Sequence, residues 1–314
     1  MNQSFLITGV YRSGTTLTDK LLHAHPDLAV GSQPFPSLFI DLKKRFLSQK
    51  GIEKTYPIDP LFMEDQYHND EFNQFLDTYP IDSKAREQIF KNLEAYDGVR
   101  TPGFITYCIN QGVITNPHAD RFATLYATLM SMLETYLGKP QALLAGSKEI
   151  ICEEYIPWFL SHHKLIIHII RDPRDIIASL SQGDGRAFMG SVRPALYTLR
   201  MWRKSAAFSF AFSGEPHYHL VRYEDLVTNP LPVLNQIADF LGVAPFSQDW
   251  FSEGIHDQEG NLWKANSSFE AYRLISPDSM GKYPSRLSPE MIQYIELVCF
   301  PEMKLLGYAD FEPP

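Results

Sequence analysis

Cysteine is scarce in this chain of 314 residues, which contains only Cys108, Cys152 and Cys299. The three are far apart and odd in number, so they indicate neither a disulfide framework nor the closely spaced pairs of a zinc site. So little cysteine, in no pattern, is typical of proteins from reducing compartments. We therefore predict a cytoplasmic location.

Long hydrophobic runs are also missing. No stretch approaches the roughly 20 apolar residues that a transmembrane helix needs. The apolar run at residues 5–7 is too short, and has too little positive charge before it, to be a signal peptide. The composition, 44% hydrophobic and 21% charged, is ordinary for a globular chain with a large core. We therefore predict no membrane partner.

Positive charge is in short supply as well. The net charge at pH 7 is −9, and residues 223–263 contain seven acidic residues but no Lys or Arg. This balance argues against nucleic acid or a sulfated glycan as a partner, because both are polyanions. It favours a neutral or cationic small molecule. Any anionic ligand would have to be held by a local basic site.

The first informative motif lies near the N-terminus. An apolar run at residues 5–7 predicts a buried strand, the chain turns at Gly9, and a helix is expected from Thr15. The spacing from Gly9 to Gly14 is that of a phosphate-binding P-loop, in which backbone N–H groups and a helix N-terminus surround an anion. The usual lysine is replaced by Thr15, so Arg12 is the only cation of the loop. An ordinary strand–turn–helix remains the alternative.

A second motif follows another predicted strand, residues 164–170. The chain continues with Arg171 and then with Asp172 and Pro173, which are favoured as the N-cap and first residue of a helix. Ser179 would then lie two turns into that helix. The alternatives are a surface cluster of Arg and Asp, or a Walker B motif.

Further apolar segments predict strands at residues 28–31, 141–145 and 218–221. We therefore predict an α/β fold with a P-loop NTPase-like parallel sheet and helices on both faces. Residues 35–139 show helical spacing between prolines, and we interpret them as a helical insertion over the carboxyl edge of the sheet. The prediction is one domain covering residues 1–314.

The two motifs together resemble those of the sulfotransferases, which use 3′-phosphoadenosine-5′-phosphosulfate (PAPS) and release the bisphosphate PAP. Residues 17–31 are most similar to the tyrosylprotein and bacterial branches of that family. The resemblance implies a 5′-phosphosulfate cradle and a 3′-phosphate and adenosine site. The cradle residues are Arg12, Ser13, Gly14, Thr15, Thr16 and Leu17. The residues for the 3′-phosphate and adenosine are Arg171, Ser179, Tyr223, Ser268 and Lys282.

The same resemblance implies transfer of the sulfuryl group to a hydroxyl or nitrogen, with no metal required. Arg12, Lys148 and Ser268 would stabilise the charge that develops on the leaving oxygen. With the acidic composition, the amide of Gln33 in place of a basic glutamate favours a small polar or cationic acceptor, as in natural-product tailoring, for example a toxin of the saxitoxin type.

One position departs from the family pattern. The tyrosylprotein branch has a proton-accepting glutamate where this chain has Gln33, and an amide cannot act as a base. Gln33 would then orient the acceptor, and either His25, His118 or Asp41 takes the proton or the acceptor needs little help. A P-loop small-molecule kinase and a catalytically inactive nucleotide-binding module remain the alternative functions. The sequence does not indicate the oligomeric state.

Overall fold

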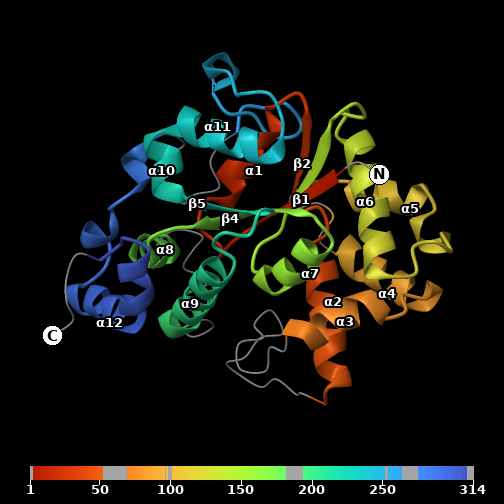
Figure 1. The fold of residues 1–314 in the computed structure, drawn as a ribbon, viewed down its shortest axis with the longest axis horizontal. Coiled ribbons are helices and arrows are strands. Elements are labelled where there is room, and N and C mark those ends of the chain that lie inside the picture. Colours follow the sequence, from red (N-terminus) through yellow and green to blue (C-terminus); the bar gives the residue numbers. More distant parts are fainter. Residues whose placement is uncertain are drawn as a thin grey trace.

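The computed structural model describes residues 3–51, 69–95, 97, 101–181, 194–251, 254–263 and 275–309. At its centre lies a five-stranded parallel sheet with the strand order β2-β3-β1-β4-β5 (Figure 1). The strands are β1 (Gln3–Thr8), β2 (Leu28–Ser32), β3 (Leu144–Lys148), β4 (Leu165–Ile170) and β5 (Tyr218–Arg222). Because all five run the same way, their carboxyl ends meet at one edge. The predicted fold class is confirmed.

The strand β3 begins three residues later than the sequence predicted. Residues 141–145 were expected to form it, but the N–H groups of Leu143 and Leu144 instead bond to Asp27 O. Gly146 lies under Phe5, whose ring atoms would be 2.3 Å from an added Cβ. The polar end of the segment belongs to the strand because Ser147 finds a buried partner in Tyr126 OH at 3.0 Å. Lys148 is therefore the last residue of β3.

One face of the sheet packs against α1 (Thr15–His23) and α11 (Pro230–Leu241). Alternate strand residues such as Phe5 and Ile7 point to this side and meet Leu21 and Leu234 in a single buried cluster. This alternation is the ordinary consequence of the two-residue period of a strand. The short α10 (Tyr223–Thr228) lies between β5 and α11.

The opposite face is covered largely by the helices between β2 and β3. Leu6, Ala145 and Ile166 contribute to this second core, so the block lies on a face of the sheet and is not confined to its edge as predicted. Its helices are α2 (Pro36–Gln49), α3 (Asn69–Thr78), α4 (Ser83–Glu94), α5 (Phe104–Asn110) and α6 (Phe122–Tyr136). The helix α7 (Ile156–Ser161), which follows β3, joins the same core.

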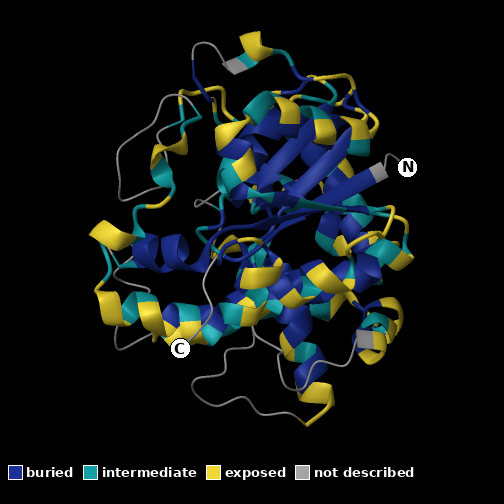
Figure 2. Cartoon of the chain, turned by 60° about the vertical axis from the view of Figure 1, so that its left-hand side comes forward, coloured by how far each residue is buried: buried dark blue, intermediate teal, exposed yellow. Residues whose placement is uncertain are grey.

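A third cluster joins α8 (Pro173–Leu180), α9 (Ala195–Ala211) and α12 (Pro289–Leu305). Figure 2 shows the strands almost entirely buried and the exposed residues on the outer sides of the helices. Single 3-10 turns complete the described structure: Val113–Thr115, Glu153–Tyr155, Gln248–Phe251, Pro277–Ser279 and Tyr283–Ser285.

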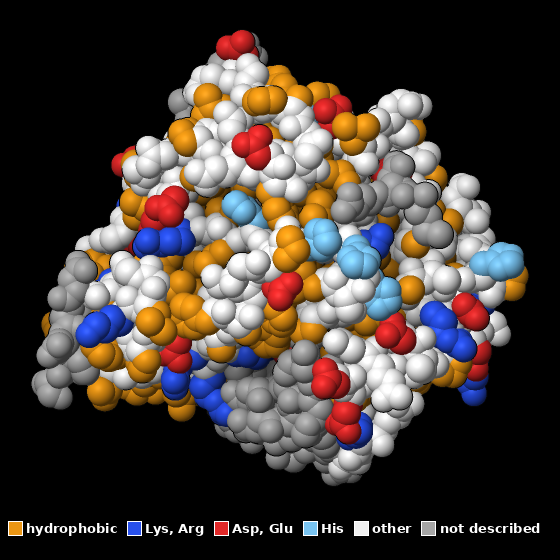
Figure 3. Space-filling view, in the orientation of Figure 1, with side chains coloured by type: hydrophobic (Ala, Val, Ile, Leu, Met, Phe, Trp, Pro, Cys, Tyr) orange, Lys and Arg blue, Asp and Glu red, His pale blue; other side chains and the backbone are white. Residues whose placement is uncertain are grey.

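In the described ranges, no helix is long and apolar enough to cross a membrane. On the face drawn in Figure 3, basic and acidic side chains are interspersed among hydrophobic ones. No patch of one charge dominates that face, although the chain as a whole is acidic.

Candidate functional site

The loop between β1 and α1 turns sharply at the carboxyl edge of the sheet. Gly9 passes so close to β4 that an added Cβ would lie 2.3 Å from Ile169 O. The loop is closed by Ser13, whose N–H and hydroxyl both donate to Val10 O, at 3.1 and 2.5 Å. Arg12 has a φ of 67°, which is unusual for a residue with a side chain. The loop is therefore a tight turn that leads into the N-terminus of α1.

Gly14 caps α1 and lies against Tyr223, the first residue of α10. With a φ of 101°, Gly14 has a conformation that residues with side chains rarely adopt, and an added Cβ would lie 2.2 Å from Tyr223 Cδ2. The predicted adenosine residue thus lies directly against the predicted phosphate loop. Thr15 and Thr16 form the first turn of α1, and the side chain of Leu17 packs toward the core beneath it.

The two sequence motifs come together at Arg12. Its Nε donates to Ser179 Oγ at 2.9 Å, and its carbonyl accepts a hydrogen bond from Arg171 NH1 at 3.1 Å. Ser179 reaches this position because it lies on α8, which starts at Pro173 directly after β4. Neighbouring parallel strands end side by side, so β1 and β4 bring the two loops into contact.

Arg171 is 8% exposed and is held from several sides. Its guanidinium lies 4.3 Å from the centre of the Tyr223 ring, and its NH2 donates to Ser279 O at 2.7 Å. Among the described residues its Nε is buried without a hydrogen-bond partner. A buried donor on a charged group is costly unless an acceptor reaches it. The site therefore fits an additional anionic group beside Arg171.

Lys282 belongs to a segment that α8 fixes in place. The carboxylate of Asp175 accepts the N–H groups of Gly281 at 2.7 Å, Lys282 at 3.1 Å and Tyr283 at 3.3 Å. Burial raises the pKa of this carboxyl, although the positive charge of Arg171 acts in the opposite direction. Tyr223 OH also lies 2.5 Å from Ser279 Oγ. Sequence reasoning missed Asp175, whose contact is more than a hundred residues away.

Lys148 lies at the end of β3, on the other side of the loop. Its side chain is fully buried, and its Nζ lies 3.3 Å from both Thr16 Oγ1 and Gln33 Oε1. Asp19 Oδ2 lies 3.4 Å from the same nitrogen. Gln33, with a φ of 47°, donates its N–H to Lys148 O at 2.8 Å and so extends the pairing of β2 with β3. The structure thus brings Lys148 and Gln33 together and adds Asp19, which the sequence analysis did not single out.

Glu149 is another titratable group that sequence reasoning missed. Burial raises the pKa of its carboxyl to about 8, although the N–H of Phe35 and the charge of Lys148 favour the ionised form. The Phe35 N–H donates to Glu149 Oε1 at 3.1 Å. Only its position directly after Lys148 could have drawn attention to it.

The three alternative bases lie in other surroundings. His25 is buried, with its Nε2 2.8 Å from Ala244 O and its ring against Phe246 and Trp250. Asp41 accepts a hydrogen bond from Asn92 within the helical block, at 2.7 Å. His118 is exposed on the loop before α6. Ser268, the predicted catalytic serine, lies outside the described residues.

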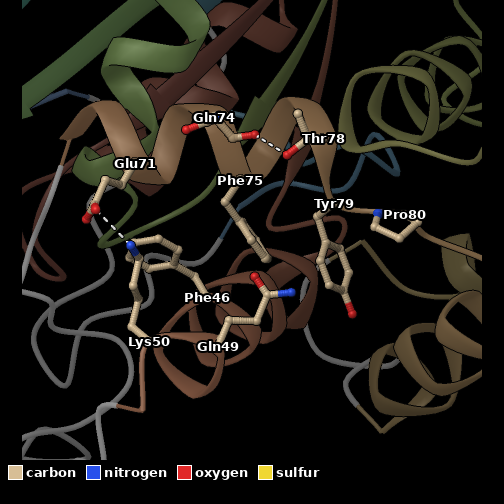
Figure 4. Close-up of a pocket in the computed structure, with 9 residues that line it drawn as sticks. All are labelled: Phe46, Gln49, Lys50, Glu71, Gln74, Phe75, Thr78, Tyr79 and Pro80. Carbon is tan, nitrogen blue, oxygen red and sulfur yellow. Dashed lines mark hydrogen bonds and ion pairs between the residues drawn. The ribbon is translucent and has the colours of Figure 1, made fainter.

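A separate pocket of about 290 Å³ lies between α2 and α3 (Figure 4). Phe46, Phe75 and Tyr79 line it, and the ion pair of Lys50 with Glu71, at 2.7 Å, lies at one side. None of the loop residues described above lines this pocket, so it is distinct from the candidate site. Within the described ranges, no group of three or more His, Cys, Asp or Glu is arranged to hold a metal.

The sheet and the loop define an α/β protein with a P-loop-like fold. Two solved structures share the fold, with a TM-score of 0.54 in each case. The sulfotransferase domain of the olefin synthase of Synechococcus PCC 7002 is 21% identical, and the alignment covers 98% of this chain and 94% of that one. The sulfotransferase domain from the curacin biosynthetic pathway is 19% identical, with 98% and 99% covered.

The sequence comparisons point to the same family. Residues 161–248, from the end of α7 to beyond α11, match the model of the sulfotransferase family. Carbohydrate sulfotransferase 1 of Danio rerio is 25% identical over 178 residues, which is 48% of this chain and 39% of that protein. Carbohydrate sulfotransferase 5 of Mus musculus is 26% identical over 167 residues, 46% and 41% respectively. The matched part is thus only about two-fifths of each relative. The family model and the names of these relatives and structures agree with the sulfotransferase resemblance of the motifs.

Proposed function

We propose that this chain binds PAPS and transfers its sulfuryl group to a hydroxyl or nitrogen of a small polar or cationic acceptor. The observation that supports this best is the contact of Arg12 with both Ser179 and Arg171. This contact joins the loop after β1, which is suited to a 5′-phosphosulfate, to Ser179 and Arg171, which are suited to a 3′-phosphate. An ordinary surface cluster of Arg and Asp would not bury Arg171 beside a P-loop.

The bound cofactor would supply the activated sulfuryl group, and the chain would supply its surroundings. N–H groups in the first turn of a helix have no partner within that helix, so residues Gly14, Thr15 and Thr16 can donate to an oxyanion. Arg171, Ser179 and Lys282 would hold the 3′-phosphate, and Tyr223 would contact the adenosine. Arg12, which contacts both Ser179 and Arg171, could bind either group.

In the transfer step, a bond from the acceptor atom to sulfur forms while the bond from sulfur to the bridging oxygen breaks. The electron pair of that bond stays on the leaving phosphate, so negative charge grows there. Lys148 and Arg12 would stabilise this charge, as preorganised cations do in phosphoryl transfer. The acceptor would lose its proton to solvent. The role of Ser268 in stabilising the same charge rests on the sequence motif alone.

The charge of the chain and the names of its relatives indicate the class of acceptor. The net charge of −9 disfavours a polyanion and favours a neutral or cationic molecule, such as a saxitoxin-type guanidinium compound. Two relatives named as carbohydrate sulfotransferases support a sugar hydroxyl as a second candidate. The two domains of biosynthetic enzymes support natural-product tailoring. The cysteines Cys108, Cys152 and Cys299 are buried free thiols, in keeping with the proposed cytoplasmic location.

The test is turnover of PAPS labelled with ³⁵S in the sulfuryl group. The purified chain is incubated with a phenol, N-acetylglucosamine, glucosamine and a guanidinium compound, and labelled products are separated by chromatography. The proposal expects a labelled product with at least one acceptor and an equal amount of PAP. The same chain with Lys148→Met is the control. Phosphate transfer from ATP–Mg²⁺ in place of sulfuryl transfer would support the kinase, and binding of PAP without any transfer would support the inactive module.

A further inference from the structure

We propose that Asp19 is a positioning residue for the transfer step, and that its carboxylate balances and orients the ammonium group of Lys148. This inference rests on the proposed function, in which Lys148 stabilises the leaving phosphate. Asp19 lies one turn after Thr16 on α1, so both side chains are on the same side of the helix. Both contact Lys148 Nζ, at 3.3 Å for Thr16 Oγ1 and 3.4 Å for Asp19 Oδ2.

The burial of the pair makes the carboxylate necessary. The side chains of Asp19 and Lys148 are both fully buried. A buried ammonium group is strongly destabilised unless an opposite charge lies beside it. Thr16 and Gln33 contact Lys148 Nζ through neutral oxygens. Asp19 places a carboxylate oxygen 3.4 Å from the same nitrogen, which favours the charged form of the ammonium group.

Asp19 is itself held in one orientation. Its Oδ1 accepts a hydrogen bond from Gln258 Nε2 at 3.3 Å and lies 3.7 Å from Lys20 Nζ. Gln258 is fixed in turn, because its Nε2 also donates to Val30 O at 3.1 Å and its Oε1 accepts from Lys20 at 2.5 Å. Because these contacts hold Asp19 Oδ1 in place, Asp19 Oδ2 faces Lys148 Nζ. In the described part of the chain, Oδ2 accepts no hydrogen bond, so its main interaction is the charge of Lys148.

This arrangement gives a reason for the neutral side chain at Gln33. One carboxylate already lies between two ammonium groups, Lys20 and Lys148, so this trio carries a net positive charge. A net positive charge suits a site that receives an anionic sulfuryl donor. A glutamate at position 33 would place a second carboxylate about where Gln33 Oε1 lies, 3.3 Å from Lys148 Nζ. It would cancel that charge and compete with the leaving phosphate for the same ammonium group.

The charges can be exchanged to test this. Asp19→Asn keeps the shape of the side chain but removes its charge, and we expect kcat for PAPS turnover to fall roughly a hundredfold. Gln33→Glu alone should also lower kcat, because the added carboxylate cancels the net positive charge beside Lys148. The double variant Asp19→Asn/Gln33→Glu returns one carboxylate to Lys148. We expect it to be at least about tenfold faster than Asp19→Asn. A residue that only supported the fold would show no such rescue.

Three measurements separate the possible outcomes. The preference for PAP over AMP, by calorimetry, should stay within about threefold in all variants, since the 3′-phosphate residues are untouched. The exposed substitution Asp239→Asn is the matched control for removing one negative charge. Melting temperatures report folding. If Asp19→Asn does not fold, the double variant is compared with Gln33→Glu and should be faster.

Two results would overturn the proposal: a kcat for Asp19→Asn within threefold of the unaltered chain, or a double variant no faster than the single variant it is compared with. An unaltered chain that neither binds PAP nor turns over PAPS would instead refute the proposed function. The failure of the one is therefore distinguishable from the failure of the other.

Discussion

The ring of Tyr223 lies so close to Gly14 that a Cβ on the glycine would come within 2.2 Å of Tyr223 Cδ2. Gly14 is the N-cap of α1, the first helix after β1, and Tyr223 is the first residue of α10, the helix after β5. The contact therefore joins the two ends of the proposed cofactor site across the sheet edge. The guanidinium carbon of Arg171 lies 4.3 Å from the centre of the same ring, so the proposed 3′-phosphate residue also contacts Tyr223.

Gly14→Ala should reduce both stability and PAP affinity. The added Cβ meets the Tyr223 ring, and alanine disfavours the φ of 101°. Together these should lower the free energy of unfolding by about 2 kcal/mol or more, measured by urea denaturation. In a chain that already contains Tyr223→Leu, Gly14→Ala should lower the free energy of unfolding by less. The smaller side chain relieves the clash with the added Cβ, while the backbone strain at position 14 remains. An equal loss of free energy of unfolding with and without Tyr223→Leu would show that the Tyr223 ring does not clash with the added Cβ.

Arg171→Ala should weaken PAP binding by about 2–4 kcal/mol, the range for losing one partner of a buried charged contact. Adenosine 5′-phosphosulfate lacks the 3′-phosphate, so its binding should change little. Calorimetric titration of both ligands checks this. Because Arg171 also bonds to Arg12 O and Ser279 O, a purely structural role is the competing explanation. An equal loss of affinity for both ligands would support that explanation.

Asp175→Asn tests the support of the Lys282 segment. The carboxylate accepts three backbone N–H groups, and asparagine keeps one acceptor oxygen without the charge. We expect about tenfold weaker PAP binding, or ~1.4 kcal/mol. The exposed Asp278→Asn on the same segment should leave the affinity unchanged. If both variants bind PAP like the unaltered chain, the segment does not depend on Asp175.

Glu149 should make stability depend on pH in an unusual direction. Burial raises its folded-state pKa to about 8, so between its ordinary value of 4.5 and pH 8 the folded chain binds more protons than the unfolded one. Its contribution to stability is therefore fully present below the unfolded pKa and is lost as pH rises to about 8. Glu149→Gln keeps an acceptor for the Phe35 N–H.

We expect the free energy of unfolding of Glu149→Gln to fall less than that of the unaltered chain as pH rises. At pH 9 it should raise the free energy of unfolding by about 1.4 kcal/mol for each unit of pKa shift. Urea denaturation of both chains at pH 5, 7 and 9 measures the difference. The exposed Glu94→Gln controls for the loss of a charge. Parallel pH profiles of Glu149→Gln and the unaltered chain would contradict the raised pKa.

The sequence predicted the sheet and the loops at its carboxyl edge because those parts have short-range signals. Apolar runs mark β1 and β4, and the pair Asp172–Pro173 marks the start of α8. Parallel strands then dictate that Arg12 and Arg171 meet. Both bounds of β3 were predicted wrongly. The N–H groups of Leu143 and Leu144 bond to Asp27 O, and the polar end, Ser147 and Lys148, has partners that only the folded chain provides.

Asp19, Asp175 and Glu149 could not have been found in this way. Each lies in a helix or just after a strand, where a carboxylate is most often exposed, and none is a residue to which the motifs give a role. What gives them a place in the site is a partner distant in the sequence: Lys148 for Asp19, Gly281 for Asp175 and Phe35 for Glu149. Such contacts depend on how β3 and the segment after Ser276 pack around α1 and α8.

The claim that the site holds PAPS is tested most directly by calorimetric titration with PAP, AMP and ATP–Mg²⁺. PAP differs from AMP by the 3′-phosphate alone, which Arg171, Ser179 and Lys282 would bind. The account predicts that PAP binds at least about a hundredfold more tightly than AMP, the ~2.7 kcal/mol expected of a buried charged contact. ATP–Mg²⁺ should bind more weakly than PAP, because Thr15 replaces the P-loop lysine. Equal affinities for PAP and AMP, or tighter binding of ATP–Mg²⁺, would contradict it.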